Sequence, residues 1–395
     1  MSHPDVVIIG AGISGVSSAL SLAEAGARVE VIERYYPAAM ASGWTLAGVR
    51  QSGRDEKELD LARAAIKKWE TLDERLGIKT GYVQSGNLRL ARNFSEAHTI
   101  STLVKNQKQL GLTIELLDQK SIAEICPFLS NNINTASFCP NDGHANPIAT
   151  VKGFRSAAEK RGVLFRTGTS VEKINIKPSE NDNKCSKIFH SLTTSNGEIF
   201  ADSCILAAGV EVNTLLATVG LQIPIKKPLV AVVETIPLAP IISPVIGVAN
   251  ADLAMKQQSN GKILFTSGGE FTKIELYEEN GCPIVSPPMK SIATTIERAI
   301  NVLPMLSKIP LRRTWGGLLD LTPDSLPILD QVSNIKGLII ASGFSGHGFG
   351  IGPIVGDILA DLALQQTPKF PIEAFRFDRF KTNKQDQQSF PQLHG

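Results

Sequence analysis

The sequence predicts an α/β protein of two domains, one with a parallel sheet flanked by helices and one rich in β-strands. Three observations support this prediction. An apolar run, a glycine-rich turn and a helical pattern follow one another in residues 6–25, and the same order returns in residues 337–361. Five prolines between residues 222 and 250 disfavour helices and favour extended chain. The length of 395 residues also exceeds that of most single domains.

The first unit of the parallel sheet lies at the N-terminus. Val6 to Ile9 form an unbroken apolar run, as expected for a buried parallel strand, and residues 13–25 carry a helical apolar pattern. A second strand is expected over Ala27 to Glu33, which closes a βαβ unit.

The later elements are expected from apolar periodicity and turn residues. Residues 55–76 predict a helix with Trp69 on its inner face, and residues 177–187 predict an exposed hairpin tip. We expect further strands at 81–91, 171–176, 188–194, 198–201 and 204–208, and further helices at 95–111 and 148–161.

The glycine-rich turn GAGISG joins the first strand to the first helix. Gly10 and Gly12 let the backbone approach a pyrophosphate at the helix N-terminus, and Gly15 lets the helix approach the strand. Glu33 ends the second strand, where its carboxylate can accept hydrogen bonds from a ribose 2′-hydroxyl. The spacing therefore predicts a dinucleotide site for FAD or NAD rather than for NADP.

Two further segments favour FAD over NAD. Small residues in ASGWTLAG, residues 41–48, would let a flat ring system lie against the backbone, and Ser42 could reach the pyrophosphate. The second glycine-rich turn, residues 343–352, opens a helix whose positive end would face the ring edge that gains negative charge on reduction.

These segments carry a resemblance to a known family. VVIIGAGISG, ASGWTLAGVR, GYVQSGNLRL, DGHANP, CILAAG, WGGLLDLTPDSLPIL and SGFSGHGFGIGP resemble the D-amino-acid oxidase family of FAD-dependent oxidoreductases, which includes glycine oxidase and the sarcosine oxidases. The resemblance covers nearly the whole chain. Within the family, the sequence most resembles the sarcosine oxidase beta subunit and the subunits of dye-linked proline or opine dehydrogenases.

The resemblance implies the fold and the domain organisation. It implies an FAD-binding Rossmann-like domain of the glutathione-reductase type and a discontinuous, sheet-rich substrate domain. The implied FAD domain comprises residues 1–52, 140–223 and 325–365, the substrate domain comprises 53–139 and 224–324, and residues 366–395 form a C-terminal tail.

The resemblance, together with the glycine turns, also implies the FAD contacts. Val171 would lie beside the adenine, and the segment ending at Gly209 would pass under the nucleotide. The predicted FAD contacts are Gly10, Gly12, Ile13, Ser14, Gly15, Glu33, Arg34, Ser42, Ala47, Gly48, Val49, Val171, Ala207, Ala208, Gly209, Gly316, Gly343, Phe344, Gly346, His347, Gly348, Phe349 and Gly350.

By resemblance, the reaction oxidises the carbon alpha to an amine of an amino acid, an imino acid, an N-methyl amino acid or an opine. A hydride passes to flavin N5 and leaves an imine. Glycine oxidase has a carboxylate-binding Arg where this chain has Leu319, so Arg50 and Arg313 are the candidate carboxylate clamps. His347, in the turn over the flavin, is the third candidate for contact with substrate.

Two alternative functions remain open at this point. Oxidation of a 2-hydroxy acid would use the same hydride geometry with a C–OH in place of the amine. The chain could also be an FAD-binding subunit or assembly factor of a multi-subunit dehydrogenase, and partner subunits fit the resemblance.

Composition and cysteine spacing exclude other classes. A net charge of +2 without a dense basic run argues against nucleic acid, and the longest uncharged stretch is too rich in glycine for a membrane span. The five cysteines show no metal-binding spacing, which predicts no metal site and a cytoplasmic location, with peripheral attachment to the inner membrane face left open. Monomeric sarcosine oxidases attach FAD to a Cys that follows the WxG motif, whereas no Cys follows Cys282 here, so noncovalent FAD is expected.

Overall fold

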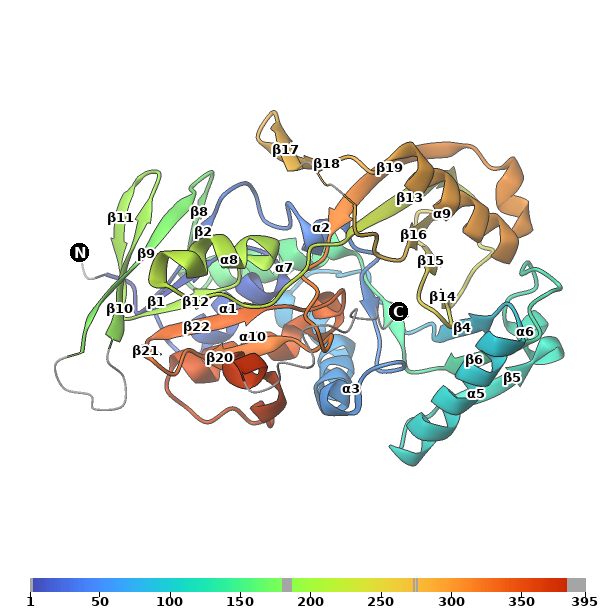
Figure 1. Ribbon diagram of the computed structural model, residues 1–395, viewed down its shortest axis with the longest axis horizontal. Helices are drawn as coiled ribbons and strands as arrows, with labels where there is room; N and C mark the ends of the chain where they lie inside the picture. The colour runs from blue at the N-terminus through green and yellow to red at the C-terminus, as the bar shows by residue number, and fades with distance from the viewer. Residues whose placement is uncertain (1–2, 180–186, 273, 275, 382–395) are drawn as a thin grey trace.

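The computed structural model describes residues 3–179, 187–272, 274 and 276–381. Two large sheets dominate the elongated molecule, and each has its own covering helices (Figure 1). The fold is therefore the mixed α/β arrangement that the sequence predicts.

The first sheet has six strands in the order β20-β22-β12-β1-β2-β8. β1, β2, β12, β22 and β8 run parallel, and β20 is antiparallel to β22. The bounds are β1 Val6–Ile9, β2 Val29–Glu33, β8 Leu164–Thr167, β12 Ser203–Leu206, β20 Ile328–Gln331 and β22 Leu338–Ser342.

Successive side chains of β1 enter two different cores, as the alternation of a strand requires. Val6 and Ile8 pack against the helices of one face, whereas Val7 and Ile9 pack against a second sheet and α8. The helical face carries α1 Ile13–Glu24, α3 Glu56–Glu70, α4 Leu72–Leu76, α7 Pro147–Glu159 and α10 Gly348–Ala363. The other face carries α8 Val212–Leu216 and β9 Val171–Pro178, β10 Lys187–Thr194, β11 Gly197–Phe200 and β21 Ile335–Lys336.

The second large sheet has eight strands in the order β19-β13-β16-β15-β14-β4-β6-β5. Its neighbouring strands are antiparallel except β14 and β4, which run parallel. The bounds are β4 Asn87–Ala91, β5 Glu115–Asp118, β6 Thr135–Cys139, β13 Leu229–Pro237, β14 Val245–Val248, β15 Leu253–Gln257, β16 Lys262–Ser267 and β19 Leu311–Leu318. The sequence prediction of a sheet-rich second lobe is confirmed.

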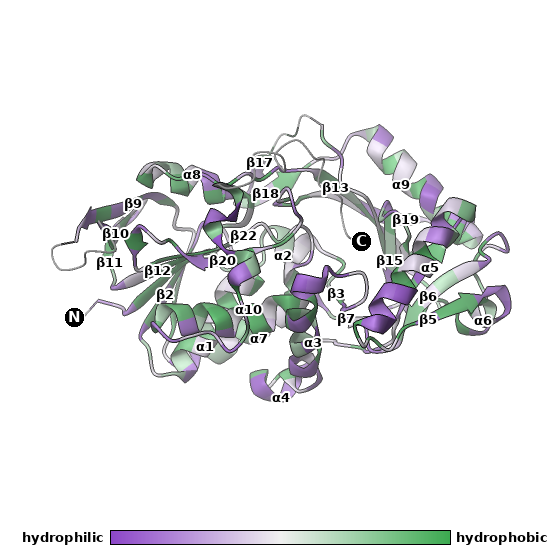
Figure 2. Cartoon of the chain, turned by 60° about the horizontal axis from the view of Figure 1, so that its bottom comes forward, coloured by the Kyte–Doolittle hydropathy of each residue, from purple (hydrophilic) through white to green (hydrophobic). Residues whose placement is uncertain are grey.

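Helices pack on both faces of this sheet, with α6 Gln119–Ile125 and α9 Met289–Val302 on one face and α5 Phe94–Gln109 on the opposite face of β4 and β6. Met255 and Phe265 pack toward α9 and α6, whereas Ala254 and Thr266 line a cavity on the opposite face. Figure 2 shows the corresponding colouring, with hydrophilic outer sides on α9 and α5 and hydrophobic strands in the first sheet. The remaining elements are α2 Ala41–Trp44, β3 Gly48–Val49, β7 Gly143–His144, β17 Leu276–Glu279 and β18 Cys282–Val285.

Two predicted elements differ from the observed ones. The helix expected over 55–76 is two helices, because the backbone leaves the helical region at Thr71. The strand expected over 81–91 begins only at Asn87, because Gly81 and Gly86 adopt left-handed angles that break the pleat. Part of the expected hairpin tip, residues 180–186, lies outside the described residues.

The segment predicted as a C-terminal tail packs against the first sheet up to residue 381. Phe375 is fully buried, and the backbone N–H of Phe377 donates to Asp330 Oδ2 at 2.9 Å. Arg379 forms an ion pair with Asp324 at 2.8 Å. Residues 366–381 of the predicted tail thus lie against the first sheet, held by Phe375, Phe377 and Arg379, and the bounds of the tail stay a prediction.

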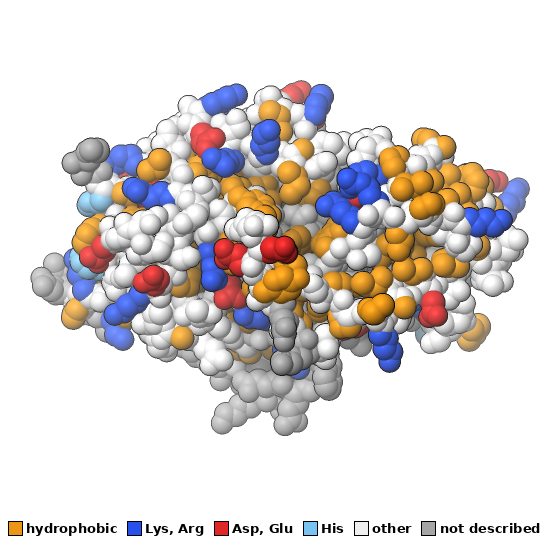
Figure 3. Space-filling model, turned by 90° about the horizontal axis from the view of Figure 1, so that it is seen from above, with side chains coloured by type: hydrophobic (Ala, Val, Ile, Leu, Met, Phe, Trp, Pro, Cys, Tyr) orange, Lys and Arg blue, Asp and Glu red, His pale blue; other side chains and the backbone are white. Residues whose placement is uncertain are grey.

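The surface of the molecule carries mixed charge. Figure 3 shows one face, on which Lys and Arg side chains are spread among acidic and apolar ones, as expected for a chain of low net charge. Within the described residues, no helix is both long enough and apolar enough to cross a bilayer. The two large sheets take their strands alternately along the chain, while the exact domain boundaries stay a prediction.

Candidate functional site

A cavity of about 410 Å³ lies between the two sheets. It begins at the carboxyl ends of β1, β2 and β12, the edge at which parallel α/β sheets bind their ligands. It ends against the face of the second sheet that carries Asn87, Ala254 and Thr266. One end is therefore built by the glycine-rich turn and the other by the second lobe.

The nucleotide end requires glycine at its first position. Gly10 has a φ of +101°, and a Cβ there would lie 2.4 Å from the carbonyl oxygen of Ala207. Glu33 is fixed beside this turn, because its Oε2 accepts from the Ala11 N–H at 2.7 Å and its Oε1 from the Tyr35 N–H at 2.9 Å. Burial raises the pKa of the Glu33 carboxyl, and these backbone hydrogen bonds oppose that rise.

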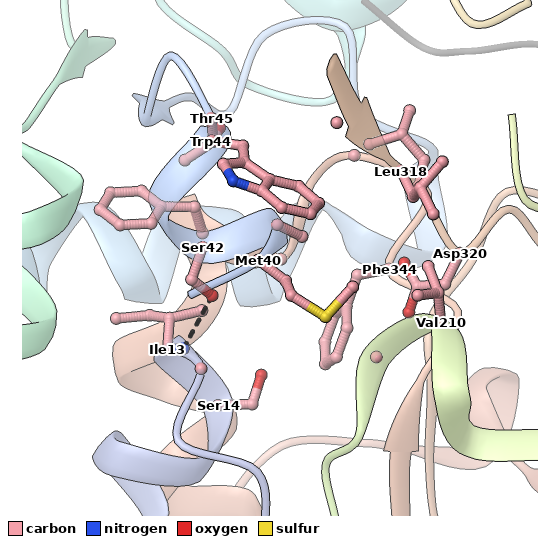
Figure 4. Close-up of a pocket in the computed structure, with 18 of the residues that line it drawn as sticks. Ile13, Ser14, Met40, Ser42, Trp44, Thr45, Val210, Leu318, Asp320 and Phe344 are labelled. Carbon is pink, nitrogen blue, oxygen red and sulfur yellow. Dashed lines mark hydrogen bonds between the residues drawn. The ribbon is translucent and has the colours of Figure 1, made fainter. Parts of the chain in front are cut away.

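Ser42 links the short helix α2 to the N-terminus of α1. Its Oγ accepts a hydrogen bond from the Ile13 N–H at 2.9 Å, the dashed line in Figure 4. A Cβ on Gly12 would lie 3.1 Å from the same oxygen, so the approach requires a small residue. The N-terminus of α1 and the Ser42 hydroxyl thus lie where a pyrophosphate would be held.

The middle of the cavity is apolar. Met40 and Phe344 point toward one another, with Trp44 on one side and Leu318 opposite (Figure 4). Asp320 lies beside Phe344 (Figure 4) and orders the second glycine-rich turn, because its Oδ2 accepts from the Gly343 N–H at 2.7 Å. Burial raises the pKa of Asp320.

His347 lies at the N-terminus of α10 and is 3% exposed. Its Nδ1 is 3.2 Å from Oε2 of Glu58, a fully buried carboxyl group on α3. A carboxylate only accepts, so Nδ1 carries the proton and Nε2 keeps its lone pair. Burial lowers the pKa of His347 to about 4, and nearby Arg54 contributes, so the ring is neutral at pH 7.

The inner end of the cavity is cationic. Arg50 and Arg54 line it together with Asn87 from β4. Burial, together with the charges of Arg54 and Arg89, lowers the pKa of Arg50 to about 9. Its side chain passes over Gly48, where a built Cβ would lie 3.5 Å from Arg50 Nε.

The structure brings most predicted site residues into the cavity wall, His347 and Arg50 among them. These are Gly10, Gly12, Ile13, Ser14, Glu33, Arg34, Ser42, Gly48, Arg50, Val171, Ala207, Ala208, Gly209, Phe344, Gly346, His347, Gly348 and Phe349. Leu319 also lines the cavity, so this position of the wall is apolar.

A smaller set of predicted residues lies behind the wall. Gly15 packs on the Gly10 carbonyl, Gly343 on Thr322 and Gly350 on the Gly48 carbonyl, each at a distance that excludes a side chain. Ala47 and Val49 are fully buried on either side of Gly48.

Two predicted positions are corrected. Arg313 lies outside this cavity, because its exposed guanidinium pairs with Glu234 at 3.2 Å in a separate surface hollow. Gly316 packs against Val285 of β18, and the cavity wall begins at the next residue, Gly317.

Sequence reasoning missed many residues of the cavity wall, and four of them matter for the site. Arg54, Asn87, Met40 and Trp44 all line the cavity. Arg54 stands four residues after Arg50 in a polar loop, the one local signal that could have indicated it. Asn87 stands in the resemblance segment GYVQSGNLRL, but no contact was assigned to it there.

The geometry defines the class first. A glycine turn with its acidic partner, a second glycine turn and a cationic inner end form a nucleotide-dependent oxidoreductase site of the Rossmann type. The chain belongs to the FAD dependent oxidoreductase family, whose model matches residues 5–362. Within the described residues, no group of three or more His, Cys, Asp or Glu side chains could hold a metal ion.

Curated relatives align with nearly the whole of this chain. Sarcosine oxidase subunit beta of Rhizobium meliloti (strain 1021) is 25% identical over 403 residues, covering 99% of this chain and 93% of that protein. Mouse mitochondrial dimethylglycine dehydrogenase is also 25% identical, but the chain covers only 43% of it.

Solved structures share the fold. L-proline dehydrogenase from P. horikoshii superimposes with a TM-score of 0.86 at 26% identity, covering 96% of this chain and 98% of that one. Glycine oxidase from Geobacillus kaustophilus superimposes with a TM-score of 0.85 at 22% identity, covering 96% and 99%. The chain therefore has the fold of these enzymes over nearly its whole length.

FAD fits the residues that are present. The turn of Gly10 and Gly12, where a Cβ on Gly10 would lie 2.4 Å from the Ala207 carbonyl, and the α1 N-terminus with Ser42 would hold the pyrophosphate. Glu33 would bind the ribose, and the apolar middle beside Phe344 would take the ring. The chain is thus an FAD-dependent oxidoreductase of this family.

Proposed function

We propose that this flavoenzyme oxidises the carbon next to the amine of an amino acid or a related secondary amine. The observation that carries the proposal is the inner end of the cavity, where two arginines and a neutral histidine meet the wall that would face the flavin. Relatives named for sarcosine, dimethylglycine, proline and glycine support an amine substrate.

FAD, when bound, accepts the hydride that leaves the substrate carbon, and the resulting imine is hydrolysed by water. The side chains of the protein have three tasks around that step: to bind the carboxylate, to keep the amine neutral and to orient its N–H.

Arg50 is the proposed carboxylate ligand, since the position of Leu319 offers no cation. A guanidinium binds a carboxylate through charge-assisted hydrogen bonds. The same positive charges disfavour a further cation nearby, so they lower the pKa of a bound substrate ammonium and favour the neutral amine.

His347 is the proposed orienting residue. Its contact with Glu58 fixes the plane of the ring, and its low pKa keeps Nε2 an acceptor above about pH 5. A neutral imidazole can accept a hydrogen bond from the substrate N–H without adding charge to a cationic site.

The manner of FAD binding and the cellular context are also proposals. We propose noncovalent FAD, since the last cysteine is Cys282 and its strand, β18, precedes the WGG segment of β19. A relative named as a subunit supports partner subunits for this chain, and we keep a cytoplasmic location with room for peripheral attachment to the inner membrane face.

An anaerobic screen tests the proposed function. The purified holoenzyme is mixed with primary and secondary amino acids and with the matching 2-hydroxy acids, and bleaching of the flavin absorbance is followed. Amines should bleach the flavin, and Arg50→Met should lower kcat/KM by roughly ten- to hundredfold through the lost charged hydrogen bonds. Bleaching by hydroxy acids alone would refute the proposal, and silence until a partner is added would favour a noncatalytic subunit.

A further inference from the structure

Asp142 is a fully buried acid in the turn between β6 and β7, outside the cavity wall. Its Oδ1 accepts from the Gln51 N–H at 2.8 Å. Its Oδ2 accepts from the Ser52 N–H at 3.2 Å and from the Ser52 hydroxyl. Gln51 and Ser52 are 6% and 4% exposed, so their backbone donors depend on this carboxyl group rather than on water.

The loop that Asp142 holds carries both arginines of the cavity wall. Arg50 immediately precedes the two bonded residues, Arg54 follows two residues after them, and both side chains line the cavity. On the same loop, the Gly53 N–H donates to Gln107 Oε1 of α5 at 3.1 Å. Arg54 Nε also donates to the Arg50 carbonyl at 3.3 Å. The direction of both guanidiniums therefore depends on how this loop is anchored.

The backbone of Asp142 joins this loop to the second sheet and to the wall that would face the flavin. Its carbonyl accepts from the N–H of Gly86, directly before β4, at 2.7 Å. Its N–H donates to the carbonyl of Cys139, the last residue of β6, at 3.3 Å. The next residue, Gly143, pairs with Val49 of β3. Asp142 thus lies where the arginine loop, the second sheet and β3 meet.

The hydrogen bonds of Asp142 leave the guanidiniums available to a ligand. Within the part of the chain that the structure describes, neither Arg50 nor Arg54 forms an ion pair with a carboxylate. Burial lowers the pKa of Arg50 to about 9, and the nearby Asp142 charge opposes that shift. An acid paired directly with Arg50 would compete with the substrate carboxylate, whereas Asp142 holds the backbone of the loop.

We infer that Asp142 is the positioning residue of the substrate carboxylate site, because it fixes Arg50 through the backbone of residues 51 and 52. The inference rests on the proposed function, which makes Arg50 the carboxylate ligand. Both carboxyl oxygens are needed, since each accepts from a different backbone N–H. An asparagine offers one oxygen, and its NH2 group would face the N–H of residue 51 or 52. Asp142→Asn therefore breaks half of this anchor at almost constant volume.

Hydrogen exchange of the holoenzyme tests the anchor without any ligand. Backbone amides of residues 50–54 should exchange roughly ten- to hundredfold faster in Asp142→Asn than in the wild type, because a buried hydrogen bond is lost. The matched control is Asp73→Asn, since Asp73 Oδ1 accepts from the N–H and the hydroxyl of Thr80 at 2.8 and 2.6 Å, outside the cavity wall. It should leave these amides unchanged. Unchanged exchange in Asp142→Asn would overturn the inference.

A pair of inert thioethers separates positioning from a merely structural role. (Methylthio)acetate carries a carboxylate, 2-(methylthio)acetamide is its neutral counterpart, and both can be titrated against the flavin absorbance. Asp142→Asn should bind the carboxylate roughly ten- to hundredfold more weakly than the wild type, because the guanidinium is no longer aimed at it. The affinity for the amide should change by less than about threefold. Equal losses for both ligands would contradict a positioning role.

Ser52→Ala is the milder variant of the same anchor. It removes the hydroxyl donor and keeps both backbone hydrogen bonds, so the affinity for (methylthio)acetate should fall by roughly two- to tenfold. If Asp142→Asn does not retain FAD, this variant carries the test. Wild-type affinity for the carboxylate in Ser52→Ala would then overturn the inference.

The outcomes distinguish this inference from the proposed function. A wild type that prefers the carboxylate, with the same preference in Asp142→Asn, would refute the positioning role and keep the proposed function. A wild type without preference, with faster loop exchange in Asp142→Asn, would refute Arg50 as the carboxylate ligand and keep the anchor. For an amine that is oxidised, Asp142→Asn should raise KM and leave kcat within about threefold, as expected for lost substrate binding. A lower kcat at unchanged KM would contradict this role.

Discussion

Lys256 gives a prediction that depends on burial alone. This residue of β15 is 1% exposed, and its Nζ donates to the Ala145 carbonyl at 2.8 Å. Burial lowers the pKa of Lys256 to about 7 from an ordinary value near 10.5. His144 next to it stays neutral, since burial and the Lys256 charge lower its pKa to about 3.

The sign of the effect follows from proton binding. Between pH 7 and pH 10.5 the unfolded chain holds a proton on Lys256 that the folded protein has released, so this residue makes stability rise with pH across that window. Each pH unit over which the unfolded chain holds one proton more than the folded protein raises the free energy of unfolding by about 1.36 kcal/mol. Because Lys256 is half protonated near pH 7, the gain from pH 7 to pH 9.5 is roughly 3 kcal/mol.

The perturbation is Lys256→Met, and the assay is urea unfolding of the holoenzyme at pH 7 and pH 9.5. From pH 7 to pH 9.5 the free energy of unfolding of the wild type should rise by roughly 3 kcal/mol relative to that of the variant. The loss of the hydrogen bond to Ala145 is the same at both values and cancels. Lys67→Met, on an exposed part of α3, should show no such shift. A stability difference that is independent of pH would refute the reasoning.

Three further outcomes are expected. Gly10→Ala should abolish FAD binding, because its Cβ would lie 2.4 Å from the Ala207 carbonyl. The control is Gly26→Ala, which also has a positive φ, +86°, but has nothing within 4 Å of the added Cβ, so it should keep the flavin-to-protein absorbance ratio of the wild type. Arg313→Met should leave KM and kcat unchanged and cost less than about 1 kcal/mol, since the Arg313 side chain is exposed and buried Glu234 keeps its ion pairs with Arg312 and Lys262. A raised KM would restore Arg313 as a clamp. Acid precipitation should release all flavin into the supernatant, and retained flavin would contradict noncovalent binding.

Local sequence patterns were enough to predict much of the fold. The apolar runs of β1 and β2, the glycines between β1 and α1, and Glu33 at the end of β2 are all within about thirty residues, so spacing alone predicted the βαβ unit. Positive-φ glycines were harder to interpret, since Gly81 and Gly86 broke a strand that apolar alternation favoured. The packing of Phe375 in the expected tail also had no local signature.

The sequence by itself determined the dinucleotide turn, the second glycine turn and therefore the family, because backbone approach to a phosphate demands glycine at set spacings. Tertiary structure alone decided what fills the inner end of the cavity. Asn87 joins Arg50 and Arg54 there because β4 pairs in parallel with β14, a contact between residues more than 150 positions apart. Arg313 lies outside the cavity because it pairs with Glu234 in a separate surface hollow. No spacing in the sequence indicates such long-range contacts.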